Sequence, residues 1–342
     1  MTAAGDLARR VALRHLPSWA GALCFCAGGV FTLVVILLMG VPAWALLLVH
    51  LADRATGTAT LGLMVMACVM ATRGSRGPPA ARAMAATARQ FWQLATTSSL
   101  VWLFAALAHL VVQHQAAAAT GPRLTLGTYV GGQWQGRLLL LQVVLVAVVV
   151  VAAVLTRPGV PRALLSMDVV LVLAAVAICA SAWAPSETST LTRRMLLLGH
   201  VLPATLWVGG LFATALVATR LTPDRARLPE IVVIYSRIAL AASVCVGLTG
   251  LALLAGWIDQ HSWLALVQHG DGPLRVGKTV LLVELMAAGA LHRKVTIARL
   301  ETTGDARLLI WVGLGELAVM GVAIALGVTL ADNAFAVPAG GG

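Results

Sequence analysis

Hydrophobic residues run through this chain in long blocks, and short polar segments rich in arginine separate the blocks. A helix needs about 20 consecutive, mainly apolar residues to cross the hydrocarbon core of a bilayer. Nine blocks approach or exceed that length, and the pattern therefore predicts an all-α, polytopic bundle of about nine transmembrane helices. The nine predicted spans are 19–39, 46–71, 91–113, 137–156, 163–184, 195–218, 238–257, 274–292 and 308–330.

The composition separates this chain from soluble proteins. Of its 342 residues, 60% are hydrophobic and only 11% are charged, whereas a soluble globular domain averages about 45–50% apolar and about 25% charged residues. A soluble enzyme, a disordered chain and a disulfide-stapled domain are therefore excluded. We expect the lipid bilayer to be the main partner of this chain.

The basic residues define an orientation in the membrane. If the N-terminus is cytoplasmic, 17 of the 24 Lys and Arg residues lie in cytoplasmic segments, as the positive-inside rule requires. The predicted topology therefore has the N-terminus inside and the C-terminus outside. Because the net charge of +11 comes from these short segments, we expect no nucleic-acid partner.

One spacing recurs in the two parts of the chain. Asp53 precedes Gly62 by nine residues, and His200 precedes Gly209 by nine residues, each near the outer start of a predicted span. Substrate sites in repeat-built membrane proteins often lie where the halves meet. We therefore expect Asp53 and His200 to approach a common central region. The alternative is that Asp53 merely pairs with Arg54.

A second spacing supports the same division. Gly136 precedes Gln142 by six residues, and Gly272 precedes Lys278 by six residues. We predict two parallel four-helix halves followed by one additional helix. The predicted divisions are a cytoplasmic segment 1–18, a first half 19–160, a second half 161–300, a ninth span within 301–335 and a flexible tail 336–342.

Most histidines lie at the outer face under this topology. The six outer histidines, of eight in the chain, are His50, His109, His114, His200, His261 and His269. Imidazole is a natural ligand for copper, zinc and haem iron, and polar residues inside a membrane are functional by default. His200 is the first candidate for a metal ligand. The alternative is that His200 hydrogen-bonds a backbone carbonyl and braces the bundle.

Four further residues are candidates for the same metal site. Asp53 would offset the charge of a metal ion or hold an imidazole in the correct tautomer. His109 is the histidine of its span that we expect to face inward, because His114 lies about 500° further round the helix and is expected to be solvated. His50 completes the outer set. Met66 offers a thioether, which suits Cu(I), although methionine also fills helix interfaces.

Charged residues also occur within the last two predicted spans. Glu284 and Glu316 lie near the middle of these spans, and Lys278 lies nearer the outer end. Because buried charge in lipid is costly, we expect all three side chains to face the bundle interior. They would relay protons, balance the charge of a cation, or form a structural network between the two helices.

Four motifs between residues 195 and 330 match one known pattern. They are His200 with Trp207-Val208-Gly209-Gly210, Tyr235-Ser236-Arg237, Gly272 with Lys278, and Glu316-Leu317. This set resembles the CopD family of copper-resistance inner-membrane proteins. One position departs from the family, whose longer members often carry Gly-His near the end of the fifth span, where this chain has Ser181-Ala182-Trp183.

The resemblance implies a multi-pass protein of the bacterial cytoplasmic membrane that takes copper at its outer face and passes it inward. It also implies a periplasmic copper carrier as a possible protein partner. We expect no enzyme, since no nucleophile–base constellation is present. The family is distantly related to di-haem b-type cytochromes. The alternative is therefore a membrane redox protein that binds haem b between His200 and another outer histidine.

Overall fold

The computed structural model describes residues 43–73, 78–120, 124–156, 166–183, 190–220, 228–264, 266, 272–293 and 307–333. Within these ranges the regular structure is helical and contains no β-strand, which confirms the all-α fold class. The predicted span 19–39, the segment 1–18 and the tail 336–342 lie outside the described residues. The other eight predicted spans each coincide with a helix.

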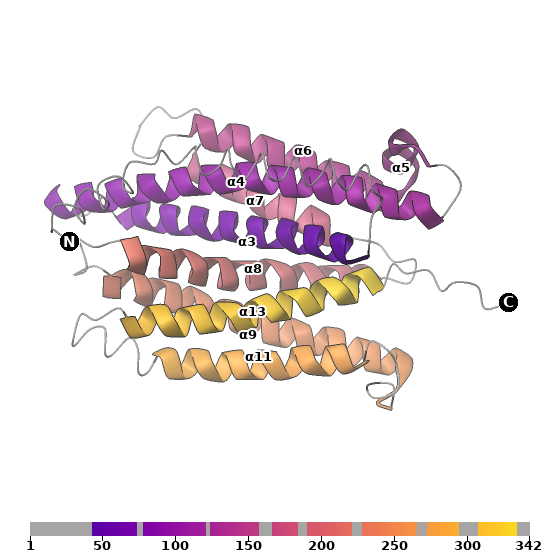
Figure 1. Ribbon diagram of the computed structural model, residues 1–342. Coiled ribbons are helices and arrows are strands. Elements are labelled where there is room, and N and C mark those ends of the chain that lie inside the picture. Colours follow the sequence, from indigo (N-terminus) through magenta and orange to yellow (C-terminus); the bar gives the residue numbers. More distant parts are fainter. Residues whose placement is uncertain are drawn as a thin grey trace, which may run out of the picture.

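The helices with described residues follow the hydropathy pattern closely (Figure 1). They are α3 (Ala43–Arg73), α4 (Pro78–Thr120), α5 (Leu126–Gly132), α6 (Trp134–Leu155), α7 (Met167–Ala182), α8 (Leu191–Arg220), α9 (Leu228–His261), α11 (Gly272–His292) and α13 (Arg307–Asn333). Short α5 was not predicted, because seven residues carry too little apolar sequence to register as a span. The side chain of Thr125 caps it by accepting a hydrogen bond from the Thr128 amide.

Six of these helices are long and apolar enough to cross a membrane: α3, α4, α6, α8, α9 and α13. This finding indicates a multi-pass membrane protein. Helix α7 is shorter, with 16 residues, and α11 carries three charged residues, Arg275, Lys278 and Glu284, within its 21 residues. The total number of spans and their orientation stay predictions.

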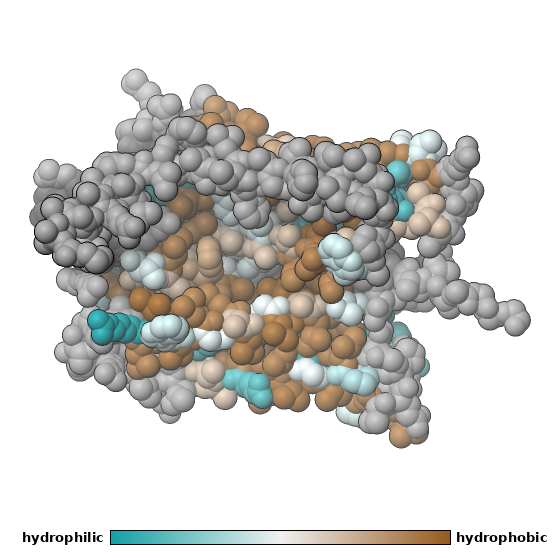
Figure 2. All heavy atoms as spheres, viewed as in Figure 1, coloured by the Kyte–Doolittle hydropathy of each residue, from teal (hydrophilic) through white to brown (hydrophobic). Residues whose placement is uncertain are grey.

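Helices α3 and α8 form the centre of the described bundle. Helix α3 packs most extensively against α4 and α8, while α8 packs against α9 and α13. In Figure 1, α4, α6 and α7 lie on one side of this pair and α9 and α11 on the other. Large apolar side chains remain exposed on the outer helices, such as Val283 on α11 and Trp311 on α13. Figure 2 shows mostly hydrophobic residues over α13 and α11, as expected of a surface that faces lipid.

The backbones of α3 and α8 touch where two glycines meet. A Cβ atom added to Gly62 would lie 2.0 Å from the carbonyl oxygen of Gly209, and one added to Gly209 would lie 2.1 Å from the carbonyl oxygen of Thr58. Only glycine permits such an approach. The glycines marked by the sequence repeat are therefore in direct contact, although the division into two halves stays a prediction.

Candidate functional site

A buried carboxylate forms the centre of a polar cluster in the described bundle. Asp53 on α3 accepts a hydrogen bond at Oδ1 from Nε1 of Trp102 (3.0 Å). Nε2 of Gln142 donates to Oδ1 at 2.9 Å and to Oδ2 at 3.1 Å, and Nδ1 of His109 lies 3.1 Å from Oδ2. All four side chains are buried. We call them the Asp53 cluster, which joins α3, α4 and α6. Three donors compensate the desolvation of this carboxylate.

The local sequence explains how the Asp53 cluster is assembled. Trp102 and His109 are seven residues apart on α4, which is two helical turns, so both side chains face α3. Gly57 lies one turn from Asp53 on α3, and a Cβ atom there would lie 2.8 Å from Cε2 of Trp102. The glycine therefore makes room for the indole that donates to the carboxylate.

Asp53 orients the His109 imidazole. Since the carboxylate is an acceptor, the hydrogen bond places the proton of a neutral His109 ring on Nδ1 and leaves the lone pair on Nε2. Histidine ligands of metals commonly make this contact to a carboxylate with the nitrogen that does not bind the metal. The geometry therefore makes Nε2 of His109 the nitrogen that is available to a metal ion.

His50 lies directly against this ring. Its imidazole stacks on His109 with 4.3 Å between ring centroids and 27° between planes. Nε of Arg54 donates a hydrogen bond to Nε2 of His50 at 3.3 Å. The same Arg54 guanidinium donates to the backbone oxygen of Ser181 at 3.0 Å and to the Ser181 hydroxyl. Arg54 thus ties α3 to α7 and lies close enough to Asp53 to act on it electrostatically. Arg54 thus acts on Asp53 through its charge, whereas Trp102, Gln142 and His109 supply the hydrogen bonds to the carboxylate described above.

A small cavity of about 20 Å³ lies beside the carboxylate, which is room for about one water molecule. Oε1 of Gln142, in the cavity wall, is a buried acceptor with no hydrogen-bond partner among the described residues. The cavity is lined by Asp53, Arg54, Gly57, Thr58, Trp102, Gln142, Ile178, Ser181, Val201 and Thr205. It therefore extends from the Asp53 cluster to α7 and α8.

His200 does not join the Asp53 cluster. Its Nδ1 lies 3.2 Å from the carbonyl oxygen of Val246 and 3.2 Å from the hydroxyl of Thr249, both on α9. Asp53 faces α4 and α6 instead, so the expected approach of these two side chains is not met. The reason is that α3 and α8 touch back to back at their glycines, and each polar residue points to its own neighbours. His200 thus makes the backbone contact named as the alternative, and the nearby Lys278 ammonium acts on it electrostatically.

Other expected site residues lie elsewhere. Met66 is fully buried in the hydrophobic core and is 13 residues beyond Asp53, about 20 Å along α3. His114 is half-buried: its Nε2 bonds the Leu124 carbonyl oxygen at 2.9 Å and its ring packs against Tyr129. The side chain of His261 and all of His269 lie outside the described structure.

The charged residues of the last two helices separate from one another. Glu284 is exposed rather than interior, which corrects the expectation for this residue. Glu316 is half-buried and acts electrostatically on Tyr235, while Lys278 packs against Gly327. Lys278 and Glu316 thus have different neighbours, Gly327 and Tyr235, among the described residues.

Sequence reasoning missed Trp102 and Ser181 as parts of the site. Trp102 lies seven residues before His109, and this spacing could have indicated that both side chains lie on the same face of one helix. Ser181 was marked in the sequence only as a departure from the resembled pattern, and its contact with Arg54 depends on the packing of α3 against α7. Within the described ranges, no three His, Cys, Asp or Glu side chains gather into a group that could hold a metal ion.

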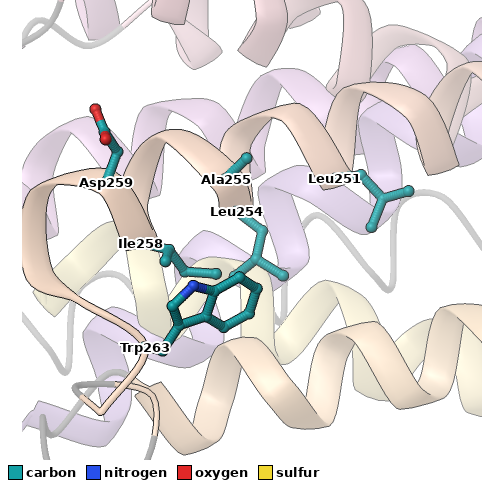
Figure 3. A pocket seen from close by; sticks show the side chains of 6 residues that line it. All are labelled: Leu251, Leu254, Ala255, Ile258, Asp259 and Trp263. Carbon is teal, nitrogen blue, oxygen red and sulfur yellow. The ribbon is translucent and has the colours of Figure 1, made fainter.

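A second cavity lies beside the described helices and shares no lining residue with the cavity beside Asp53. It is an open groove of about 580 Å³ along the end of α9 (Figure 3). Its lining residues are Leu251, Leu254, Ala255, Ile258, Asp259 and Trp263. Leu254, Ile258 and the Trp263 indole lie together in Figure 3, whereas the Asp259 carboxylate points away from them. The groove thus offers an apolar surface and no metal ligand.

Comparisons with protein-family models, curated proteins and solved structures found no match for this chain.

Proposed function

We propose that this chain is an integral membrane protein that binds copper near the outer end of the bundle, at Nε2 of His109 with His50 beside it, and passes it across the cytoplasmic membrane. The observation that carries the proposal is the contact between Asp53 and Nδ1 of His109. It pre-orients an imidazole and leaves Nε2 available, as metal sites require. The resemblance to the CopD family supports copper as the transported ion, inward passage and a copper carrier outside the membrane.

The donor set fits cuprous ion better than a metal that needs four ligands. Imidazole suits copper, and Cu(I) binds stably with few ligands. Asp53 is held by Trp102 and Gln142, so it supports His109 instead of binding the ion itself. Arg54 bonds Nε2 of His50, and copper binding at that nitrogen would release this contact.

Haem b fits the described residues poorly. Its iron would need two histidines on opposite faces of a macrocycle, but the His50 and His109 rings stack directly on each other. His200 belongs to the α8–α9 contact instead, and the cavity beside Asp53 has room for about one water molecule. We therefore favour copper handling over the redox alternative.

Equilibrium dialysis of the purified protein against Cu(I) under reducing conditions tests this proposal. We expect wild-type protein to bind copper tightly and His109→Ala to lose the tight site. His114→Ala, on the next turn of the same helix, is the matched control and should bind as wild type does. His200→Ala should also retain binding. Tight binding that survives in His109→Ala and disappears in His200→Ala would reject this site.

A further inference from the structure

Lys278 on α11 brings a positive charge into the space between α8, α11 and α13. Its side chain is half-buried, and a Cβ atom added to Gly327 on α13 would lie 3.0 Å from its Nζ. Gly327 therefore provides the room in which the ammonium lies. A larger residue at that position would displace it.

Two further nitrogen-bearing side chains lie near this ammonium. The Lys278 charge acts electrostatically on His200 of α8 and on Arg275, one turn earlier on α11. The Arg275 guanidinium lies over the Trp257 ring of α9, 4.8 Å from its centroid. Residues three apart on a helix are neighbours on its surface, so the two cationic groups lie near one another, with Arg275 against α9 and Lys278 against α13.

No carboxylate of the described structure forms an ion pair with Lys278. Glu284 and Asp259 are exposed, and Glu316 acts on Tyr235. A charged ammonium within a membrane protein is costly unless a counter-charge accompanies it. The counter-charge is therefore expected from a ligand.

The first half of the chain provides an instructive comparison. Gln142 and Lys278 hold equivalent places in the sequence repeat, as do Asp53 and His200. Gln142 hydrogen-bonds the Asp53 carboxylate, whereas the ammonium of Lys278 meets an imidazole. The first half thus has a carboxylate, Asp53, beside a neutral amide. The second half has a neutral imidazole, His200, beside the positively charged Lys278.

We propose that Lys278 and Arg275 bind a phosphate group beside α11, between Trp257 of α9 and Gly327 of α13, in a site bordered by His200. Lysine supplies a compact charge and arginine a planar set of donors, which together suit phosphate oxygens. The phosphate is either free or carried by a lipid headgroup. The apolar groove of Figure 3 lies on α9, the helix that carries Trp257, and would accept an acyl chain in the lipid case. This inference does not rest on copper binding.

Thermal unfolding of the purified protein in a neutral detergent tests the proposal with two probes. One series adds inorganic phosphate, with sodium chloride at matched ionic strength as reference. The other adds phosphatidylglycerol, with phosphatidylcholine as reference. We expect saturable stabilisation by at least one probe over its reference. Stabilisation by phosphate identifies a free anion, and stabilisation by phosphatidylglycerol alone identifies a lipid headgroup.

Variants at the two lysines of the chain complete the test. Lys278→Gln, which introduces the residue of the first half, should weaken the apparent affinity for the stabilising probe at least about tenfold, as expected when a charge-assisted contact is lost. Lys278→Arg should retain it, and Lys294→Gln is the control at the other lysine. Wild-type protein that responds no more to either probe than to its reference would overturn the proposal. So would a Lys278→Gln variant that responds as wild type does.

Discussion

Gly62 on α3 and Gly209 on α8 lie in direct backbone contact, and each fills a position where a Cβ atom would collide with the opposite helix. The sequence repeat places these two glycines at equivalent distances from Asp53 and His200. The contact fixes the approach of the two central helices. It also determines the direction in which the polar residues further out on each helix point.

Substitution at this contact should destabilise the fold. Gly209→Ala places Cβ 2.1 Å from the Thr58 carbonyl oxygen, and we expect a loss of about 1–3 kcal/mol in the free energy of unfolding, as for other overpacked sites. Gly289→Ala is the matched control, because its Cβ would meet nothing within 4 Å and alanine favours the helix. Thermal unfolding in detergent measures both. Equal midpoints for the two variants would contradict the close contact.

Trp102 should stabilise the buried carboxylate through its indole N–H. Trp102→Phe removes one donor to Asp53 while it keeps most of the aromatic packing. We expect a loss of about 1–3 kcal/mol, since hydrogen bonds to charged groups are strong and the deprived oxygen stays buried. Trp311→Phe, at an exposed tryptophan, is the control. If the two variants unfold at the same temperature, the indole contact contributes nothing to stability.

Tyr129 of α5 should titrate at unusually high pH. Burial raises the pKa of its phenol from 10.0 to about 12, and the hydroxyl has no hydrogen-bond partner among the described residues. Because the unfolded chain then loses this proton first as pH rises, the free energy of unfolding should fall between pH 10 and 12. In Tyr235→Phe protein, which retains one tyrosine, near-ultraviolet absorbance isolates the titration. A midpoint near pH 10 would show that this phenol is exposed.

The orientation of the chain is open to a direct test. Reporter fusions after Gly77 and Arg225 should be cytoplasmic, and fusions after Thr120, Ala265 and Gly340 should be external. The reason is the excess of basic residues in the segments assigned to the cytoplasm. A cytoplasmic reporter after Gly340 would contradict the nine-span topology and the placement of the histidines at the outer face.

The positions of the helices could be predicted well from sequence, but their rotations could not. Long apolar runs specify where α3, α8 and α9 lie along the chain, since length and hydropathy decide this. A helix that is apolar on all sides does not reveal which face meets a neighbour. His200 therefore bonds α9, as the alternative for this residue had it, while His109 faces inward as expected.

The contacts that complete the Asp53 cluster were harder to foresee for the same reason. Gln142 was marked by the repeat, but its bond to Asp53 requires α6 to pack beside α3 and α4. The Arg54 contact with Ser181 joins residues 127 positions apart. Such pairs depend on tertiary packing, which local sequence patterns do not encode.

The central claim is that Asp53 acts on copper through His109, and a double-mutant cycle tests it most directly. Competition with a chromophoric chelator gives the Cu(I) affinity of wild type, Asp53→Asn, His109→Ala and the double variant. Asparagine keeps the size of the side chain but removes its charge. We expect Asp53→Asn to weaken binding by about 10–100-fold in the wild-type background, as for other carboxylates behind a ligand histidine, and to add no further loss in the His109→Ala background. A loss of the same size in both backgrounds would contradict the account.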